Sequence, residues 1–216
     1  MLYYNTISAP LRQMLLQLTA APAFEHFRLV GGTGLSLQLG HRMSVDLDFF
    51  SDVAYGIIDF DGIEDYLRKS FRYLDHLSDI NPGLGKSFMV GSDADQAIKL
   101  DIYYTDTFIQ PARMVDNIRL ASVEEILAMK IDIVQRGGRK KDFWDLHELL
   151  EHYSIQQMLT LHFQRYEFNH NEQLILQNFT DFSIADDDFN PICLRGKYWE
   201  FIKEDIEGAI DKYNKK

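Results

Sequence analysis

Hydrophobic residues recur along this chain with two different periods, and the change falls near residue 121. A first amphipathic helix is predicted by apolar residues at helical spacing behind Ser8: Leu11, Met14, Leu15 and Leu18. Short apolar runs then predict strands over 26–30, 45–50, 88–90 and 97–104, with a helix over 63–71. This mixture predicts an α/β arrangement for the N-terminal half.

The segment after Gly31-Gly32-Thr33 is compatible with two structures. Leu35, Leu37 and Leu39 alternate with other residues, which is typical of a strand. A Gly-Gly-Thr turn that follows a strand commonly opens a helix, and the backbone N–H groups of such a first helical turn can bind a ligand. We predict the helix.

From Ser122 onward the pattern is helical throughout. Ser122 to Glu125 has the spacing of a capping box, and Ile126, Leu127, Ile131 and Val134 follow on one face. Further helices are predicted around 143–150, 155–163 and 199–213, with an acidic loop over 185–191. We therefore predict two domains, an α/β domain over 1–120 and a helical domain over 121–216.

Composition narrows the class of protein. The net charge of -11 argues against broad, nonspecific nucleic-acid binding, which depends on Lys and Arg. One cysteine, Cys193, excludes an intrachain disulfide, and no apolar run is long enough to span a membrane, so we expect a cytoplasmic protein with no membrane partner. The basic stretch Arg136 to Lys141 is either a local nucleic-acid patch or solvated surface.

The spacing of Asp46 and Asp48 suggests metal binding. Two residues apart on a predicted strand, both carboxylates point to one face, while Val45, Leu47 and Phe49 point to the other. Such a pair repels itself unless a cation neutralises it, and hard oxygen ligands suit Mg²⁺ or Mn²⁺. The alternative is an edge strand whose outer face is simply wet.

Asp101 is a candidate third carboxylate. It lies on a second apolar strand, among Ile98, Leu100 and Ile102, and it would complete a two-metal site if the two strands are neighbours. A solvent-facing aspartate on an edge strand is the alternative.

The glycine turn is the candidate phosphate site. Without side chains, Gly31 and Gly32 allow backbone N–H groups to approach a phosphate, and the helix dipole favours negative charge there. The hydroxyl of Thr33 or Ser36 could add a hydrogen bond. The combination of this turn with an Asp-x-Asp strand twelve residues later is more specific than either part.

Three residues of the second half are candidates for the same chemistry. Lys130 lies on the apolar stripe of its helix, where a lysine should be paired or functional, unless its stem reaches from the stripe to the surface. Asp142 and Asp145 share one helix face and could position Lys130, a metal or a substrate hydroxyl. A plain role in the first turn of the helix is the alternative.

Three further side chains are candidates for nucleotide binding. Arg42 and Ser44 could contact phosphate, although Arg42 could equally pair with Asp46 or Asp48 as structural support. Arg136 is an additional candidate for the triphosphate. The histidines show no metal-binding spacing, and His41 and His147 are expected to be structural or surface residues.

The motifs in combination resemble a known family. The segment Gly31 to Phe50 (GGTGLSLQLGHRMSVDLDFF) is similar to the first motif of the AbiEii-type nucleotidyltransferases, toxins of type IV toxin–antitoxin systems within the DNA polymerase β superfamily. Two later segments resemble that family's later motifs, EILAMK at Glu125 to Lys130 and KDFWDL at Lys141 to Leu146. The resemblance spans roughly residues 25 to 150.

This resemblance implies an α+β fold, with a polymerase-β-like mixed sheet followed by an all-helical half, and an active cleft between them. It implies a nucleoside triphosphate as substrate and Mg²⁺ or Mn²⁺ as cofactor. Asp46 and Asp48 would bind metal, Gly31, Gly32 and Thr33 would hold phosphate, and Lys130 and Asp142 would complete the site. Asp101 lies where the superfamily's third acid usually stands, a position at which this family varies.

The expected function is transfer of a nucleoside monophosphate to an acceptor hydroxyl. An RNA end similar to that of tRNA is the leading acceptor, and a cognate antitoxin is the expected protein partner. Two alternatives stay open at this point. One is a small-molecule nucleotidyltransferase, which the acidic charge suits better, and the other is a nucleotide-binding or partner-binding module without turnover.

Overall fold

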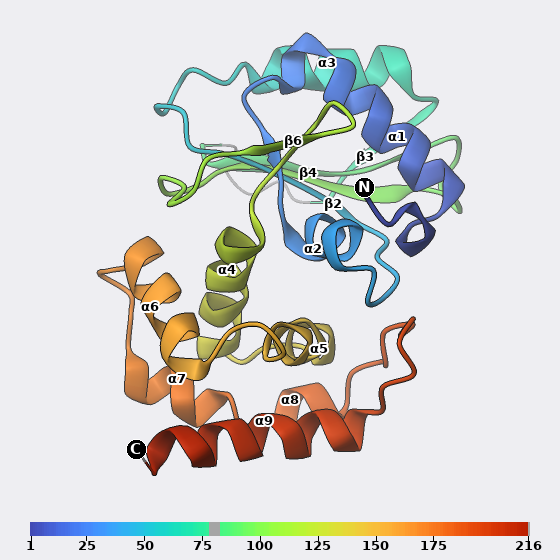
Figure 1. The fold of residues 1–216 in the computed structure, drawn as a ribbon. Coiled ribbons are helices and arrows are strands. Elements are labelled where there is room, and N and C mark those ends of the chain that lie inside the picture. Colours follow the sequence, from blue (N-terminus) through green and yellow to red (C-terminus); the bar gives the residue numbers. More distant parts are fainter. Residues whose placement is uncertain (78–82, 216) are drawn as a thin grey trace. The chain divides into compact units, whose positions relative to one another are not determined.

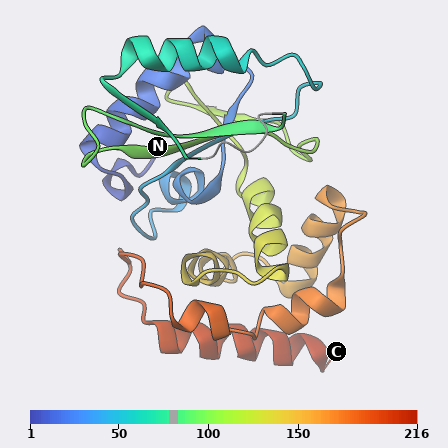
Figure 2. The same cartoon turned by 180° about the vertical axis from the view of Figure 1, so that it is seen from behind.

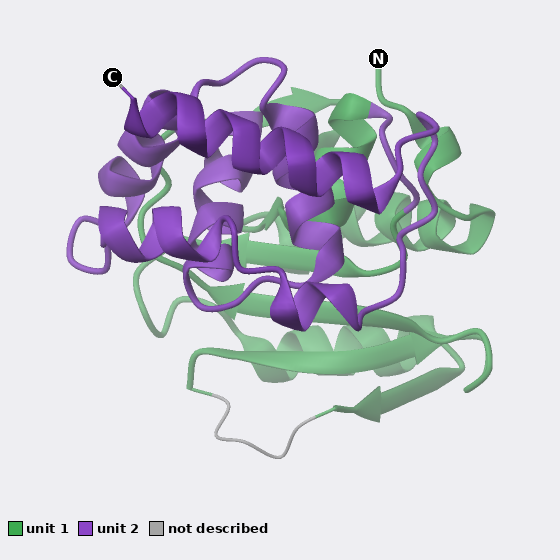
Figure 3. Ribbon diagram, turned by 90° about the horizontal axis from the view of Figure 1, so that it is seen from below, with its two compact units in different colours: residues 1–39, 44–122 green, residues 40–43, 123–216 purple. Residues whose placement is uncertain are grey.

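The computed structural model describes residues 1–77 and 83–215, and the chain folds into two compact units. Unit 1 contains residues 1–39 and 44–122, and unit 2 contains residues 40–43 and 123–216 (Figure 3). The four residues 40–43 thus belong with the C-terminal helices, although they lie between two elements of unit 1. No helix in the described part of the chain is long and apolar enough to cross a lipid bilayer.

Unit 1 is built on a mixed β-sheet. Among the described residues, seven strands form one sheet in the order β3-β4-β5-β2-β1-β7-β6. Their bounds are β1 (Arg28–Leu29), β2 (Leu47–Ser51), β3 (Tyr73–His76), β4 (Gly85–Gly91), β5 (Ile98–Tyr104), β6 (Arg113–Val115) and β7 (Ile118–Leu120). The pairs β2–β5 and β1–β7 are parallel, and the other neighbours are antiparallel.

Helices cover both faces of this sheet. The helices α1 (Ala9–Ala20) and α3 (Phe60–Ser70) lie on one face and α2 (Gly31–Leu39) on the other (Figure 1). Of the short 3₁₀ turns, η1 (Tyr4–Thr6) contacts α2, and η2 (Pro22–Phe24) contacts α1 and α3. The first predicted helix is confirmed as α1, and Ser8 caps it, since its side chain accepts a hydrogen bond from the Leu11 N–H.

The helix predicted after the glycine turn is also confirmed, as α2. Its alternating leucines do not signal a strand, because Leu35, Leu37 and the intervening Ser36 are all fully buried. A helix buried around most of its circumference loses the one-sided pattern by which surface helices are recognised.

The core of unit 1 lies between the sheet and the helices α1 and α3. On β2 and β5, the residues that face this core are fully buried: Leu47, Phe49, Leu100 and Ile102. The predicted strand over 45–50 is wrong at its start, because β2 begins at Leu47 and Val45 is 69% exposed. Asp46 therefore precedes the strand, and Asp48 alone of the pair lies within it.

Unit 2 is helical, as the pattern predicted. Its helices are α4 (Val123–Gln135), α5 (Lys140–Leu149), α6 (Ile155–Arg165), α7 (Glu172–Asn178), α8 (Ser183–Asp186) and α9 (Trp199–Asn214). Helix α4 contacts α5, α6 and α7, while α9 contacts α5 and α6, so the apolar stripes of these helices meet in one core (Figure 2). The predicted acidic loop over 185–191 is wrong at its start, because residues 185 and 186 end α8, and neither α7 nor α8 was predicted.

Candidate active site

Asp48 and Asp101 occupy neighbouring positions on the sheet. Strands β2 and β5 are adjacent and parallel, and their register sets Asp48 directly opposite Asp101. Residues opposite each other project from the same face, and neighbouring strands are about 4.8 Å apart. Because Leu47 and Leu100 fill the other face, both carboxylates lie on the side of the sheet away from α1 and α3.

Lys99 provides positive charge to this carboxylate pair. It lies two residues before Asp101 on the same face of β5, and its ammonium donates a hydrogen bond to Asp101 Oδ2. Burial lowers the pKa of Lys99, but the hydrogen bond and charge of Asp101, together with the charges of Asp48 and Asp46, outweigh burial and raise it. Lys99 was not predicted from the sequence, although its Lys-x-Asp spacing on a strand was the signal for it.

Gly31 ties the glycine turn to Asp48. Its φ is +64°, a backbone angle that residues with a Cβ rarely adopt, and a Cβ there would stand 2.0 Å from Asp48 Oδ2. Helix α2 begins at Gly31, so the free N–H groups of its first turn lie beside the Asp48 carboxylate. The turn and the second aspartate of Asp-x-Asp thus form one local site in unit 1.

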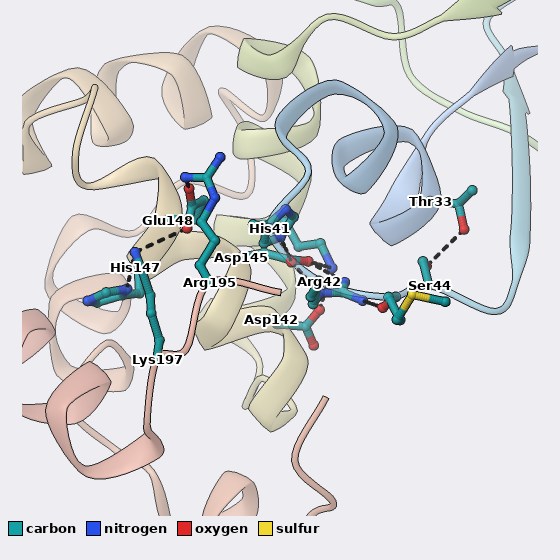
Figure 4. A network of polar contacts seen from close by, with 12 residues as sticks. Thr33, His41, Arg42, Ser44, Asp142, Asp145, His147, Glu148, Arg195 and Lys197 are labelled. Atoms are coloured by element: carbon teal, nitrogen blue, oxygen red, sulfur yellow. Dashed lines mark hydrogen bonds and ion pairs between the residues drawn. The ribbon is translucent and has the colours of Figure 1, made fainter. Parts of the chain in front are cut away.

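Thr33 and Ser44 hold the chain just before β2. Thr33 is 1% exposed, and its hydroxyl is hydrogen-bonded to Ser44 Oγ at 2.8 Å (Figure 4). The same hydroxyl donates a hydrogen bond to the Asp46 carbonyl oxygen. Ser36, the other hydroxyl considered for phosphate, is fully buried. These contacts fix the position of the backbone at Asp46.

The carboxylates of unit 1 fit a divalent cation bound together with a substrate. Asp101 Oδ1 is buried and has no hydrogen-bond partner among the described residues, so it is an acceptor that a cation could satisfy. Within residues 1–77 and 83–215, no group of three His, Cys, Asp or Glu side chains could by itself hold a metal ion. Mg²⁺ is commonly bound by one or two carboxylates plus substrate phosphates, which matches this arrangement.

In unit 2, Asp145 is the centre of a buried polar cluster. Its carboxylate is fully buried and accepts hydrogen bonds from His41 Nε2 at 2.7 Å and from Arg42 Nε at 2.6 Å and Nη2 at 2.8 Å (Figure 4). The Lys130 ammonium lies 2.8 Å from Asp145 Oδ2, the oxygen that Arg42 Nη2 also contacts. Burial raises the pKa of Asp145, but the charges of Arg42 and Lys130 and the hydrogen bonds outweigh it and hold this pKa well below its usual range.

This cluster explains why residues 40–43 belong to unit 2. Arg42 pairs with Asp145 in a two-pronged contact, so the predicted alternative, pairing with Asp46 or Asp48, is not what these hydrogen bonds show. The Arg42 side chain is 4% exposed. His41 is buried, as expected for a structural histidine.

Lys130 and Asp142 form a second buried contact of the same cluster. The Lys130 ammonium is 2.6 Å from Asp142 Oδ1, and each side chain is 4% exposed. Burial lowers the pKa of Lys130, but the charges of Asp145 and Asp142 outweigh it and raise this pKa. Asp142 also accepts a hydrogen bond from the Arg139 N–H at 3.0 Å, so it closes the first turn of α5 as well.

The basic stretch from Arg136 to Lys141 contacts the acidic segment of the same unit. Arg139 donates two hydrogen bonds of 3.0 Å to the Asp188 carboxylate, and Lys140 Nζ is 3.3 Å from the Asp186 carbonyl oxygen. Arg136, whose side chain is 68% exposed, pairs with Asp132 one turn earlier on α4. Much of the positive charge in this stretch is thus offset locally.

Comparison with solved structures places the fold among the nucleotidyltransferases. MenT4, a nucleotidyltransferase toxin from Mycobacterium tuberculosis, matches with a TM-score of 0.59 and 14% identity, covering 91% of this chain and 78% of MenT4. The JHP933 protein of Helicobacter pylori matches with a TM-score of 0.55 and 20% identity over 95% of this chain and 89% of that chain. An antigenic nucleotidyltransferase-like protein from Paracoccidioides brasiliensis matches with a TM-score of 0.51 and 16% identity, covering 94% and 93%.

The family follows from the sequence profile. The family described as "Nucleotidyl transferase AbiEii toxin, Type IV TA system" matches residues 13–213, and the chain belongs to this family. It is therefore a nucleotidyltransferase of the toxin–antitoxin class, with the α+β fold that the sequence predicted. A search of curated proteins returned no match.

Proposed function

We propose that this enzyme transfers a nucleoside monophosphate from a nucleoside triphosphate to the terminal hydroxyl of an RNA acceptor such as a tRNA 3′ end. In this proposal it is the toxin of a type IV pair and has a cognate antitoxin. The observation that carries the chemistry is the in-register pair Asp48 and Asp101, with the Gly31 turn directly against Asp48. Family membership supports the transfer reaction.

The proposed metal ligands are Asp46, Asp48 and Asp101, which would hold Mg²⁺ or Mn²⁺ together with the triphosphate. A bound divalent cation supplies charge neutralisation for the phosphates and activation of the attacking hydroxyl. Gly31 and Gly32 would bind phosphate through their backbone N–H groups at the start of α2. Thr33 would act through its hydrogen bond to the Asp46 carbonyl, by fixing where that aspartate lies.

The covalent step joins the acceptor oxygen to the α-phosphorus and breaks the bond from that phosphorus to the bridging oxygen. Pyrophosphate leaves with the electron pair of the broken bond. The proton of the acceptor hydroxyl passes to solvent water, because both oxygens of Asp101 have other roles: Oδ2 accepts a hydrogen bond from Lys99, and Oδ1 is the proposed cation ligand.

The roles suggested for unit 2 stay predictions. Lys130 would stabilise charge on the triphosphate, and Asp142 would hold its ammonium, to which it lies at 2.6 Å. Arg42, Arg136 and Asp145 of unit 2, together with Ser44 of unit 1, stay predicted nucleotide-binding residues. For Asp145 the hydrogen bonds from His41 and Arg42 support a positioning role.

The test is incubation of the purified protein with each α-labelled nucleoside triphosphate, Mg²⁺ and a total RNA pool. Labelled RNA is the expected product for wild type, and the double variant Asp46→Ala with Asp48→Ala should give none. Asp65→Ala is the matched control, because Asp65 is an exposed carboxylate on α3 of the same unit.

Two results would contradict the proposal. The first is the absence of labelled RNA with wild type, in which case small hydroxyl compounds are tested as acceptors, an alternative that the net charge of -11 favours. The second is labelling by the double variant at the wild-type level. Nucleotide binding in calorimetry without pyrophosphate release would indicate a binding module instead.

A further inference from the structure

The face of the sheet that carries Asp48 and Asp101, here called the catalytic face, also carries two aromatic residues. Phe50 lies two residues after Asp48 on β2, and Tyr103 lies two residues after Asp101 on β5. Because side chains alternate along a strand, both rings lie on the same face as the carboxylates, about 7 Å further along. The register sets Phe50 opposite Tyr103, so the two form one row across the sheet, here called the aromatic pair.

The aromatic pair is not part of the core of unit 1. The residues that alternate with it, such as Phe49 and Ile102, are fully buried on the opposite face, whereas Phe50 and Tyr103 are both partly exposed. Their ring centroids are 6.2 Å apart, with the ring planes at 74°. Both aromatic residues thus keep accessible surface beside two carboxylates, where a ligand with an aromatic face can cover it.

Contacts with β4 fix the Tyr103 ring. Gly85 lies opposite Tyr103, and a Cβ at Gly85 would stand 2.3 Å from Tyr103 Cδ1, so the ring rests against the bare glycine backbone. At its other end, the Tyr103 hydroxyl is 2.7 Å from Ser87 Oγ. A ring held at both ends loses little conformational entropy when a flat ligand packs against it.

We propose that Phe50 and Tyr103 form a stacking site for the terminal nucleobase of the acceptor. This inference rests on the proposed function, and it adds that the acceptor is recognised by an aromatic base next to its reacting hydroxyl. Stacking on an aromatic ring tolerates any base, because every base has a π-face. The site would therefore select nucleic-acid ends over acceptors without a base.

The order of the strands assigns the site to the acceptor and not to the triphosphate. Gly31 follows β1, on one side of Asp48, whereas Tyr103 lies on β5, on the other side. In phosphoryl transfer the attacking and leaving oxygens are roughly in line across the phosphorus. With the triphosphate at the start of α2, the acceptor approaches from the side of β5 and β4.

The test measures binding of a short 5′-fluorescein oligoadenylate to wild type and to Tyr103→Leu by fluorescence anisotropy. Loss of one stacked base should raise Kd by about 5- to 150-fold. Phe50→Leu should have an effect in the same direction, and Tyr103→Phe, which keeps the ring but loses its hydroxyl contact with Ser87, should lose much less affinity than Tyr103→Leu. Tyr73→Leu on the edge strand β3 is the matched control, with no loss expected.

A second probe keeps the test decisive even where a variant folds poorly. An oligoadenylate whose terminal residue is an abasic ribose should bind wild type as weakly as the intact probe binds Tyr103→Leu. Equal binding of the intact and abasic probes by wild type would overturn the proposal. An increase in the KM of the triphosphate, with the Kd of oligoadenylate unchanged in Tyr103→Leu, would also overturn it, because the stacked base would then belong to the incoming nucleotide.

Failure of the stacking site and failure of the proposed function give different results. If wild type labels RNA while the aromatic variants and the abasic probe make no difference, only the stacking site is excluded. If wild type labels no RNA but transfers to small hydroxyl compounds, the RNA acceptor itself is excluded.

Discussion

At the scale of single residues, the candidate site requires a glycine at position 31. We expect Gly31→Ala to lower the transfer rate by about 100-fold, because the new methyl would stand 2.0 Å from Asp48 Oδ2 and must displace that carboxylate. Steady-state labelling with α-labelled triphosphate measures the effect.

Gly196→Ala is the control for backbone strain. Its φ of +65° matches that of Gly31, but no atom in the described part of the chain lies within 4 Å of its added Cβ. Both substitutions should cost stability by about 1–2 kcal/mol, and only Gly31→Ala should lose activity. Equal activity losses in the two variants would show that strain, and not the contact with Asp48, is the cause.

A second residue-scale prediction concerns pH. Burial lowers the pKa of His41 below its usual 6.5, and this effect outweighs the hydrogen bond and charge of Asp145, which raise it. Below about pH 6.5 the unfolded chain therefore binds a proton at this residue that the folded chain does not, so stability should decrease as the pH falls. Urea midpoints between pH 7.5 and 5.5 measure this.

His41→Gln should show a smaller decrease over the same interval, because glutamine does not titrate. His152→Gln, at an exposed position, is the control and should follow wild type. An identical pH dependence in wild type and His41→Gln would contradict the assignment to His41.

At the scale of elements, the Asp145 cluster fixes residues 40–43 against the helices of unit 2. Asp145→Ala should destabilise the protein by about 3–5 kcal/mol, because it leaves Arg42 and Lys130 buried without this partner. Chemical denaturation measures the loss. Glu151→Ala, which removes an exposed partner of Lys197, should cost about 0–1 kcal/mol, and a similar small cost for Asp145→Ala would refute the structural role.

Long elements with a clear hydrophobic pattern could be predicted from the sequence, and short ones could not. The predicted helices behind Ser8 and from Ser122 onward correspond to α1 and α4, and the strand over 97–104 to β5. The hairpin of β6 and β7 was missed because its strands have three residues each. Its signal was the pair Asp116 and Asn117, both with positive φ, at the turn between them.

Individual residues of the candidate site could be predicted from local sequence patterns, whereas their contacts could not. Asp48 and Asp101 were found because each lies on an apolar strand, but their opposition depends on strand order and register, which no local pattern contains. The buried partner Asp145 of Arg42 lies about a hundred residues away along the chain, so proximity in sequence could not suggest it. Lys99 and the aromatic pair were missed because an isolated i, i+2 spacing is common on strands.

At the scale of the whole molecule, the net charge of -11 restricts how the enzyme can recognise RNA. We expect a random-sequence duplex to bind no more tightly than about 10⁻⁴ M at physiological salt, since nonspecific binding depends on phosphate neutralisation. Fluorescence anisotropy over a salt series measures this affinity. Micromolar binding that weakens steeply with salt would show that the basic stretch from Arg136 to Lys141 binds nucleic acid after all.

The most direct test of the proposed metal site is the binding of Mn²⁺ in the presence of a nucleoside triphosphate, measured by electron paramagnetic resonance. Wild type and Asp65→Asn should bind Mn²⁺ equally. Asp48→Asn and Asp101→Asn should each weaken this binding at least tenfold over the Mn²⁺–nucleotide background, because each removes one proposed ligand. Unchanged Mn²⁺ binding by both of these variants would contradict a metal-dependent site on the paired strands β2 and β5.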